Sequence, residues 1–116
     1  FLTNFHSVPG DGEPRLMVPR EQVSAAIEVA KKASLDALAI CIGLWLTDFR
    51  ADLAAMSVPT LVIHGDGDQI VPFPASGRRM PHFVPDAEVH VISGGPHGVL
   101  ASHPDEVAAA LLAFLA

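Results

Sequence analysis

The sequence predicts an α/β fold in which two parallel strands pack against helices. Two short runs rich in β-branched residues, 58–63 and 88–92, are separated by one helical stretch and followed by another. A strand–helix–strand–helix order favours a parallel pair joined by a right-handed crossover. Two amphipathic helical patterns precede the first strand. We therefore expect a helical, cap-like segment over residues 1–53 and a strand–helix–strand–helix unit over residues 54–116.

The segment before the first strand combines a loop with two helices. Residues 6–19 carry a run of Pro, Gly and Asp that is typical of turns. Residues 19–32 place apolar side chains at i, i+3, i+4 and i+7, and Pro19 suits the first turn of a helix. A second helix is predicted over residues 34–46. Ser34 is its expected cap, because a serine hydroxyl can accept a hydrogen bond from an unpaired N–H of the first turn.

The second half of the chain contains the predicted strands. Residues 58–63 are typical of a buried strand, and residues 88–92 form the second one. Between them, residues 74–80 favour a short helix. Pro81 should end or kink that helix, because proline has no N–H to donate and clashes with the preceding turn. Pro104 opens a final helix whose first turn carries two acidic residues, which suits the positive end of the helix dipole.

Composition excludes several classes of function. With 116 residues, half of them hydrophobic and 17% charged, the chain can form one domain with a modest core. Its net charge of -6 argues against nucleic acid as a partner, and no apolar run approaches the roughly 18 residues that span a bilayer.

The single cysteine, Cys41, excludes an internal disulfide, and its apolar helical surroundings predict a small core residue. We expect a reducing compartment, the cytoplasm. No signal peptide is visible, and the start without Met suggests a segment of a longer protein.

Asp68 and His97 are the candidate catalytic residues. Asp68 follows the first predicted strand, and His97 follows the second. Parallel strands release their following loops at the same edge of the sheet, so the two side chains can meet there. An aspartate in that position can accept the imidazole N–H, fix the tautomer and stabilise the imidazolium. The imidazole can then act as a general base and acid.

Four stretches resemble the α/β-hydrolase family. PTLVIHGDGDQIVP (59–72) is similar to the acid-bearing strand of the family, and GGPHG (94–98) is similar to its histidine loop. TDFRADL (47–53) and ASGR (75–78) extend the resemblance to the branch of arylesterases and cofactor-free haloperoxidases, also called non-haem chloroperoxidases. The resemblance covers essentially the whole chain. It implies the C-terminal part of an α/β-hydrolase fold, with residues up to about Leu53 as the helical cap.

The resemblance also implies roles for individual residues. In this branch the triad acid precedes an x-x-Val-Pro segment, which corresponds to Asp68 rather than Asp66. The triad histidine corresponds to His97. The serine of the family lies in a Gly-x-Ser-x-Gly elbow, and no serine of this chain has that context. Ser76, within Ala-Ser-Gly, lacks the preceding glycine.

The implied activity is therefore acyl transfer by a complete enzyme. The resemblance implies a small ester or carboxylic acid substrate, esterase and possible perhydrolase or haloperoxidase activity, and no metal or organic cofactor. An N-terminal hydrolase half carrying the serine would be the partner, and the chain alone is expected to be inactive. A non-catalytic alternative is a hydrolase remnant that associates with itself through the open edges of a two-stranded sheet.

A weaker alternative is metal-dependent hydrolysis. Its candidate ligands are His64, Asp66, Asp68, His97 and His103. These are ordinary metal-ligand types, but they lack a tight ligand spacing such as His-Glu-x-x-His. Under the triad hypothesis, Asp66 braces its loop and His64 is a packed residue at the end of a strand. The remaining histidines are predicted at the surface: His6, His82 and His90.

Overall fold

The computed structural model describes residues 2–116; Phe1, the first residue of the predicted cap-like segment, lies outside them. Strands β3 (Leu61–Gly65) and β4 (Glu88–Ile92) pair in parallel, with Leu61 opposite Glu88 and Gly65 opposite Ile92. The predicted parallel pair is confirmed. The first strand begins three residues later than expected, since Pro59 has no N–H to contribute to a ladder.

Two short 3₁₀ helices connect the strands, η1 (Phe73–Ala75) and η2 (Gly77–His82). The prediction of one helix that Pro81 ends or kinks is wrong in detail, because Pro81 lies inside η2. In this tighter helix the hydrogen bonds reach back three residues, and runs are short. After β4 come α5 (Val99–Ser102) and α6 (Pro104–Leu115), the predicted final helix.

Six elements precede the sheet. They are α1 (Leu2–Phe5), β1 (Ser7–Val8), β2 (Arg15–Leu16), α2 (Arg20–Ala30), α3 (Leu35–Leu44) and α4 (Arg50–Ala54). The predicted loop over residues 6–19 contains a correction, because β1 and β2 pair there as a short antiparallel ladder. Ser34 caps α3 as expected, with its hydroxyl oxygen accepting from the Ala37 N–H at 3.4 Å.

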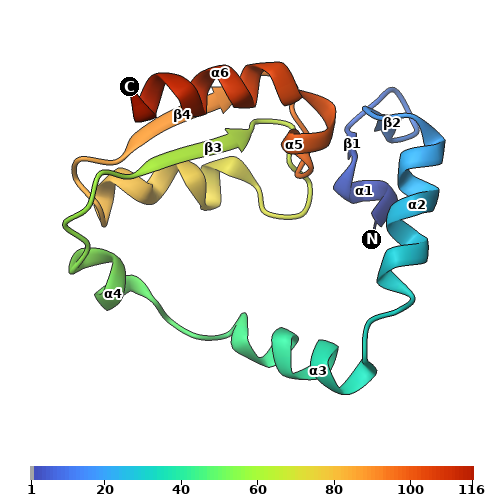
Figure 1. The fold of residues 1–116 in the computed structure, drawn as a ribbon, viewed down its shortest axis with the longest axis horizontal. Coiled ribbons are helices and arrows are strands. Elements are labelled where there is room, and N and C mark those ends of the chain that lie inside the picture. Colours follow the sequence, from blue (N-terminus) through green and yellow to red (C-terminus); the bar gives the residue numbers. More distant parts are fainter. Residues whose placement is uncertain (1) are drawn as a thin grey trace.

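The buried core lies against the two strands. Helix α6 covers one face of the sheet and η2 lies on the other (Figure 1). Ile92, Val99 and Val107 form the buried cluster, and Ile63 of β3 packs against it. A separate group of buried valines lies in the N-terminal part: Val8, Val18 and Val23.

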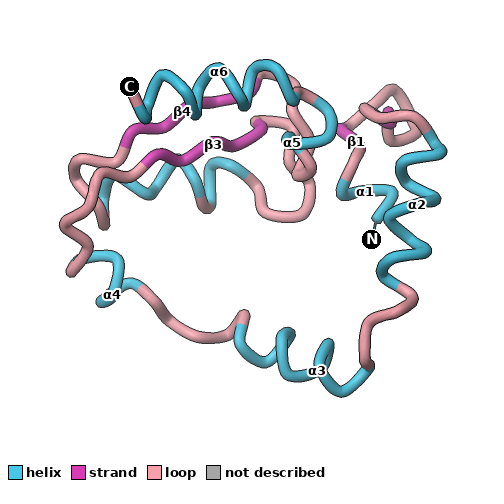
Figure 2. Tube along the Cα trace, viewed as in Figure 1, coloured by secondary structure: helices cyan, strands magenta, loops and turns pink. Residues whose placement is uncertain are grey.

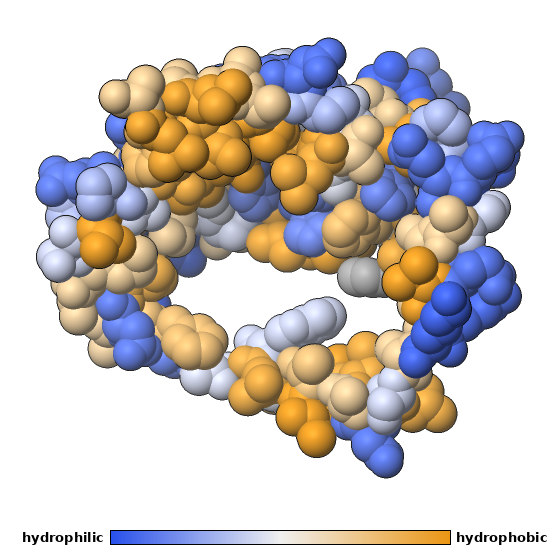
Figure 3. Space-filling view, in the orientation of Figure 1, coloured by the Kyte–Doolittle hydropathy of each residue, from blue (hydrophilic) through white to orange (hydrophobic). Residues whose placement is uncertain are grey.

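The cap-like segment departs from the sheet and returns to it. Residues 31–34 and 45–49 connect α3 to α2 and α4, and the chain traces an open ring (Figures 1 and 2). The opening remains when side chains are drawn in full (Figure 3). No residue of α3 is buried, and Cys41 is exposed. The prediction of Cys41 as a core residue is therefore wrong, because nothing in residues 2–116 covers this helix. Within the same residues, no helix is both long and apolar enough to cross a membrane.

Candidate active site

The loops that follow β3 and β4 are joined at one edge of the sheet. The Asp66 N–H donates to the Ile92 carbonyl at 3.1 Å, and the Gly67 N–H donates to the Gly95 carbonyl at 3.0 Å. Gly65 lies so close to this second loop that a Cβ there would collide with the Gly95 carbonyl. A glycine at this position is therefore a steric requirement for the contact between the loops.

Asp68 and His97 meet at this edge, as predicted. The Asp68 Oδ2 atom lies 2.7 Å from His97 Nδ1, and the Asp68 side chain is only 2% exposed. The other oxygen, Oδ1, accepts from the backbone N–H groups of Ile70 at 2.8 Å and Val71 at 2.9 Å. An ionised carboxylate only accepts hydrogen bonds, so His97 carries its proton on Nδ1 and its Nε2 remains available as a base.

The pKa of Asp68 reflects opposing effects. Burial acts to raise it, because a low-dielectric environment disfavours the charged form. The Val71 N–H, the His97 side chain and the Ile70 N–H together outweigh burial, and the pKa lies below its ordinary value of 3.8. Asp68 is therefore ionised at neutral pH and can stabilise an imidazolium at His97.

A second imidazole contacts the same carboxylate. His64 Nε2, on β3, lies 3.1 Å from Asp68 Oδ2 and 2.9 Å from the Val71 carbonyl oxygen. The His64 side chain is 15% exposed, in agreement with the prediction of a packed residue at the end of a strand. The triad hypothesis does not predict its contact with Asp68, because a spacing of four residues does not bring side chains together in an extended strand.

Asp66 has the bracing position expected for it. Its Oδ1 atom accepts from the Gly94 N–H at 2.6 Å, across the gap between the two loops. Gly94 has a φ of +67°, in the left-handed region that glycine adopts without strain. Asp66 therefore holds the histidine loop against the acid loop, while Asp68 faces His97.

The N-terminal segment also contacts the site, which the sequence did not predict. The Phe5 ring meets the His97 ring edge to face, with centroids 4.6 Å apart. The Gly98 N–H donates to the Phe5 carbonyl at 2.8 Å. On the acid loop, the Gln69 side-chain amide donates to the Ser7 carbonyl at 3.3 Å. No sequence pattern marks these contacts, because they join residues far apart in the chain.

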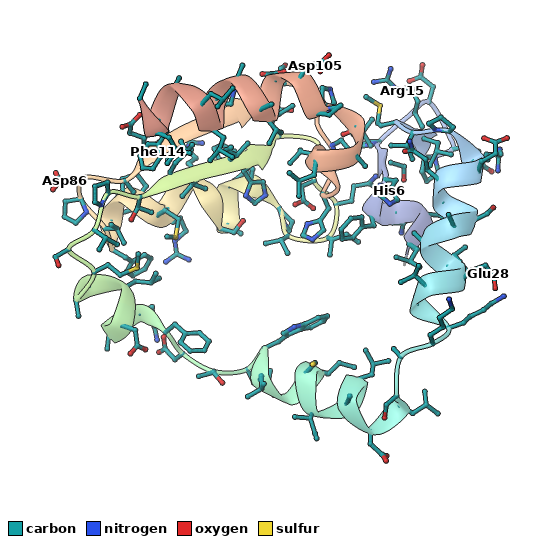
Figure 4. The ribbon with its side chains drawn as sticks, viewed as in Figure 1. His6, Arg15, Glu28, Asp86, Asp105 and Phe114 are labelled. Atoms are coloured by element: carbon teal, nitrogen blue, oxygen red, sulfur yellow. The ribbon has the colours of Figure 1, made fainter. Side chains whose placement is uncertain are left out.

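His6 is a correction to the predicted surface histidines. It is 7% exposed, and its Nδ1 atom has no hydrogen-bond partner within residues 2–116. Figure 4 labels His6 beside the N-terminal helix α1. Burial lowers its pKa, because the neutral ring is easier to desolvate. The other two lie at the surface as predicted: His82 is exposed, and the partly exposed His90 faces Glu106 at 3.3 Å.

A small cavity of about 110 Å³ adjoins the acid–imidazole pair. Residues from both strand ends line it: Ile63, His64, Gly65, Asp68, His97 and Val99. A reacting group could approach His97 from this space, since the side chain is 29% exposed.

Three serine hydroxyls of the chain form hydrogen bonds with groups other than His97. Ser76 donates to the Pro72 carbonyl at 2.9 Å, and Ser7 donates to the Thr3 carbonyl at 2.9 Å. Ser102 pairs with His103 Nδ1 at 2.8 Å. Among residues 2–116, no serine is hydrogen-bonded to His97. Nor does any group of three or more His, Cys, Asp or Glu side chains in this range have an arrangement that could hold a metal ion.

Comparisons with known proteins place this chain in a family. A family model described as "Alpha/beta hydrolase family" matches residues 3–110, and the chain belongs to that family. A putative non-heme chloroperoxidase from Synechocystis is 41% identical over 98 residues, which are 84% of this chain and 36% of that protein. A bifunctional esterase/perhydrolase from Acinetobacter calcoaceticus is 36% identical over 69 residues, which are 60% of this chain and 25% of that protein.

A solved structure agrees with the fold. The crystal structure of a bromoperoxidase from Bacillus anthracis superposes with a TM-score of 0.90 at 37% sequence identity. The match covers 98% of this chain and 41% of the bromoperoxidase chain. The chain thus has part of an α/β-hydrolase fold, and it spans about two fifths or less of the length of each of these three relatives.

Proposed function

We propose that this chain is the C-terminal part of a serine hydrolase, with Asp68 and His97 as the acid and base of its catalytic triad. The 2.7 Å contact between Asp68 Oδ2 and His97 Nδ1 carries the proposal. It fixes the tautomer that leaves His97 Nε2 free to accept a proton from a serine hydroxyl. The serine would come from the part of the hydrolase that this chain does not contain.

The reaction follows from these positions. His97 Nε2 takes the proton of the serine hydroxyl as the serine oxygen attacks an ester carbonyl, and Asp68 stabilises the imidazolium. The proton then passes to the departing alcohol, which leaves an acyl-serine. Water activated by His97 releases the acid and restores the serine. The names of the relatives support a further step in which hydrogen peroxide replaces water and the product is a peracid.

The substrate class is a small ester or a carboxylic acid. In this arrangement residues 1–53 form a helical cap and residues 54–116 form the last part of the hydrolase core. The apolar surface of α3 supports this division, because a helix that is apolar all round is normally covered. The partner proposed for the open side of β3 is the serine-bearing part of the hydrolase.

A second candidate is a non-catalytic, self-associating domain. The open edge of β3 and the exposed apolar side chains of α3 favour it, since both promote contact between copies. Intact mass and sedimentation of this chain test for self-association, and hydrolysis of p-nitrophenyl acetate by the chimera described next tests for catalysis. A 12.2 kDa chain that forms oligomers, together with an inactive chimera, supports the second candidate.

The triad proposal is tested by joining this chain to the part of the B. anthracis bromoperoxidase that it does not match. We expect ester hydrolysis by the chimera and background hydrolysis by this chain alone. Asp68→Asn and His97→Ala should each lower kcat/KM about 10³–10⁴-fold. Asp66→Asn is the matched control and should mainly lower stability. Full activity of the His97→Ala chimera would contradict the proposal, and loss of activity only with Asp66→Asn would move the acid to that position.

A further inference from the structure

We propose that His64 is a positioning residue that sets the orientation and basicity of the acid–imidazole pair. It donates a second imidazole N–H to the oxygen of Asp68 that His97 uses. The proposal rests on the proposed triad, in which Asp68 and His97 act together, but the geometry behind it belongs to this chain alone.

The direction of the His64 contact follows from its second neighbour. His64 Nε2 lies 2.9 Å from the Val71 carbonyl oxygen, and a carbonyl can only accept. The proton of neutral His64 is therefore on Nε2. The 3.1 Å contact from the same nitrogen to Asp68 Oδ2 is then a donation as well, and His64 shares one N–H between two acceptors.

The surroundings hold the His64 ring in this position. Gly77 of η2 approaches the ring so closely that a Cβ there would lie 2.6 Å from His64 Nδ1. The Phe73 ring packs on another side, with centroids 5.4 Å apart. The tight approach of Gly77 leaves the imidazole little freedom to rotate, so its Nε2–H stays directed at Asp68 and Val71.

The contact closes a ring of hydrogen bonds around the carboxylate. Asp68 Oδ1 accepts the Val71 N–H, and His64 joins the Val71 carbonyl to Asp68 Oδ2. Both carboxylate oxygens are therefore linked to Val71, Oδ1 directly and Oδ2 through His64. Rotation of the carboxylate away from His97 would break these bonds together, and the buried charge would lose its donors.

His64 also competes with His97 for the charge on Oδ2. A carboxylate that accepts from two imidazoles stabilises each positive charge less than a carboxylate with one partner. Arg79 of η2 lines a pocket together with His64 and adds a positive charge to these surroundings. Removing the His64 donor should therefore strengthen the bond between His97 and Asp68, because the full charge of the carboxylate becomes available to one imidazole.

Nitrogen-15 NMR of the imidazole rings tests the proposal on this chain, without turnover. We expect His64 as the Nε2–H tautomer and His97 as the Nδ1–H tautomer. In His64→Phe, the proton on His97 Nδ1 should resonate further downfield, because the bond from this proton to Asp68 Oδ2 strengthens when the second donor is lost. His64→Gln, whose amide nitrogen can replace the Nε2–H, should keep this resonance near the wild-type value. His90→Phe is the matched control, because this β4 histidine faces Glu106 and not Asp68.

Two results would overturn the proposal: an Nδ1–H tautomer of His64, or an unchanged resonance of the His97 Nδ1–H proton in a folded His64→Phe chain. The wild-type tautomer decides the question if that variant does not fold. In the active chimera, His64→Phe should also move the acid limb of the kcat/KM profile to higher pH, with rescue by His64→Gln. A merely structural role would lower Tm without moving that limb. Because the NMR readout needs no serine, failure of the proposed function and failure of this inference give different results.

Discussion

Four N–H groups converge on the Asp68 carboxylate, two from the backbone and two from imidazoles. A buried carboxylate needs such donors, because its desolvation cost is otherwise large. The donors come from the turn itself, from β3 and from the loop after β4. The residue proposed as the triad acid is thus also the point at which three parts of the fold are joined.

The lowered pKa of Asp68 predicts how stability depends on pH. A group whose pKa is lower in the folded state stabilises the fold above its ordinary value, 3.8 here, and loses that contribution as pH falls through the folded value. The wild-type advantage over Asp68→Asn should therefore be greatest near neutral pH and shrink from about pH 5 to about pH 2. Urea unfolding of both chains checks this. An advantage that grows on acidification would contradict it.

Gly65 is predicted to be intolerant of any side chain. The Cβ of Gly65→Ala would meet the Gly95 carbonyl and force the two loops apart, at a cost of about 2 kcal/mol or more. Gly43→Ala is the control, since nothing lies within 4 Å of its Cβ and alanine favours a helix by about 1 kcal/mol. Urea unfolding compares them. Equal effects of the two substitutions would refute the steric explanation.

At the scale of elements, the short segment of residues 5–8 contacts both loops of the candidate site. The Phe5 carbonyl accepts from the histidine loop, and the Ser7 carbonyl accepts from the acid loop. Val8 lies against Gly67 in the same way, close enough that a Cβ on Gly67 would clash with it. The segment therefore ties together the two loops that carry the site.

Phe5→Ala should loosen the histidine loop. Loss of the ring contact with His97 is expected to cost about 1–3 kcal/mol and to speed hydrogen exchange of the Gly98 amide, which donates to the Phe5 carbonyl. Asn4→Ala, an exposed neighbour in α1, is the control and should leave that amide protected. Unchanged exchange of the Gly98 amide in Phe5→Ala would show that the ring does not hold the loop.

At the scale of the molecule, exposed apolar side chains within residues 2–116 include those on α3 and on the outer face of α6 (Figure 3). Ile40 of α3 is 66% exposed, and Leu112 of α6 is 68% exposed. Apolar surface of this kind in a small chain promotes association. Together with the open edge of β3, it makes the chain a candidate for concentration-dependent oligomers.

Ile40→Lys should reduce that association. The new charge replaces an exposed apolar side chain, so the weight-average mass in sedimentation should fall toward that of the monomer. The free energy of unfolding should stay within about 0.5 kcal/mol of the wild-type value. Ala39→Lys adds the same charge to the same helix but removes less apolar surface. If both substitutions dissociate the oligomer equally, charge repulsion rather than loss of apolar contact is responsible.

The sequence determined the parts that local chemistry dictates. The β-branched runs specify both strands, Ser34 specifies the start of α3, and the order of elements specifies a parallel pair. That order also places Asp68 and His97 at one edge, because parallel strands end on the same side. These features depend on periodicity, capping and topology, all of which are visible along the chain.

Only the tertiary structure decided the rest. The second imidazole at Asp68, the ring of Phe5 on His97 and the burial of His6 all arise from segments brought together by folding. The exposure of Cys41 has the same origin, because an apolar helical pattern predicts burial but cannot say whether a covering surface is present. Contacts of this kind depend on packing between distant residues, for which a single sequence carries no local pattern.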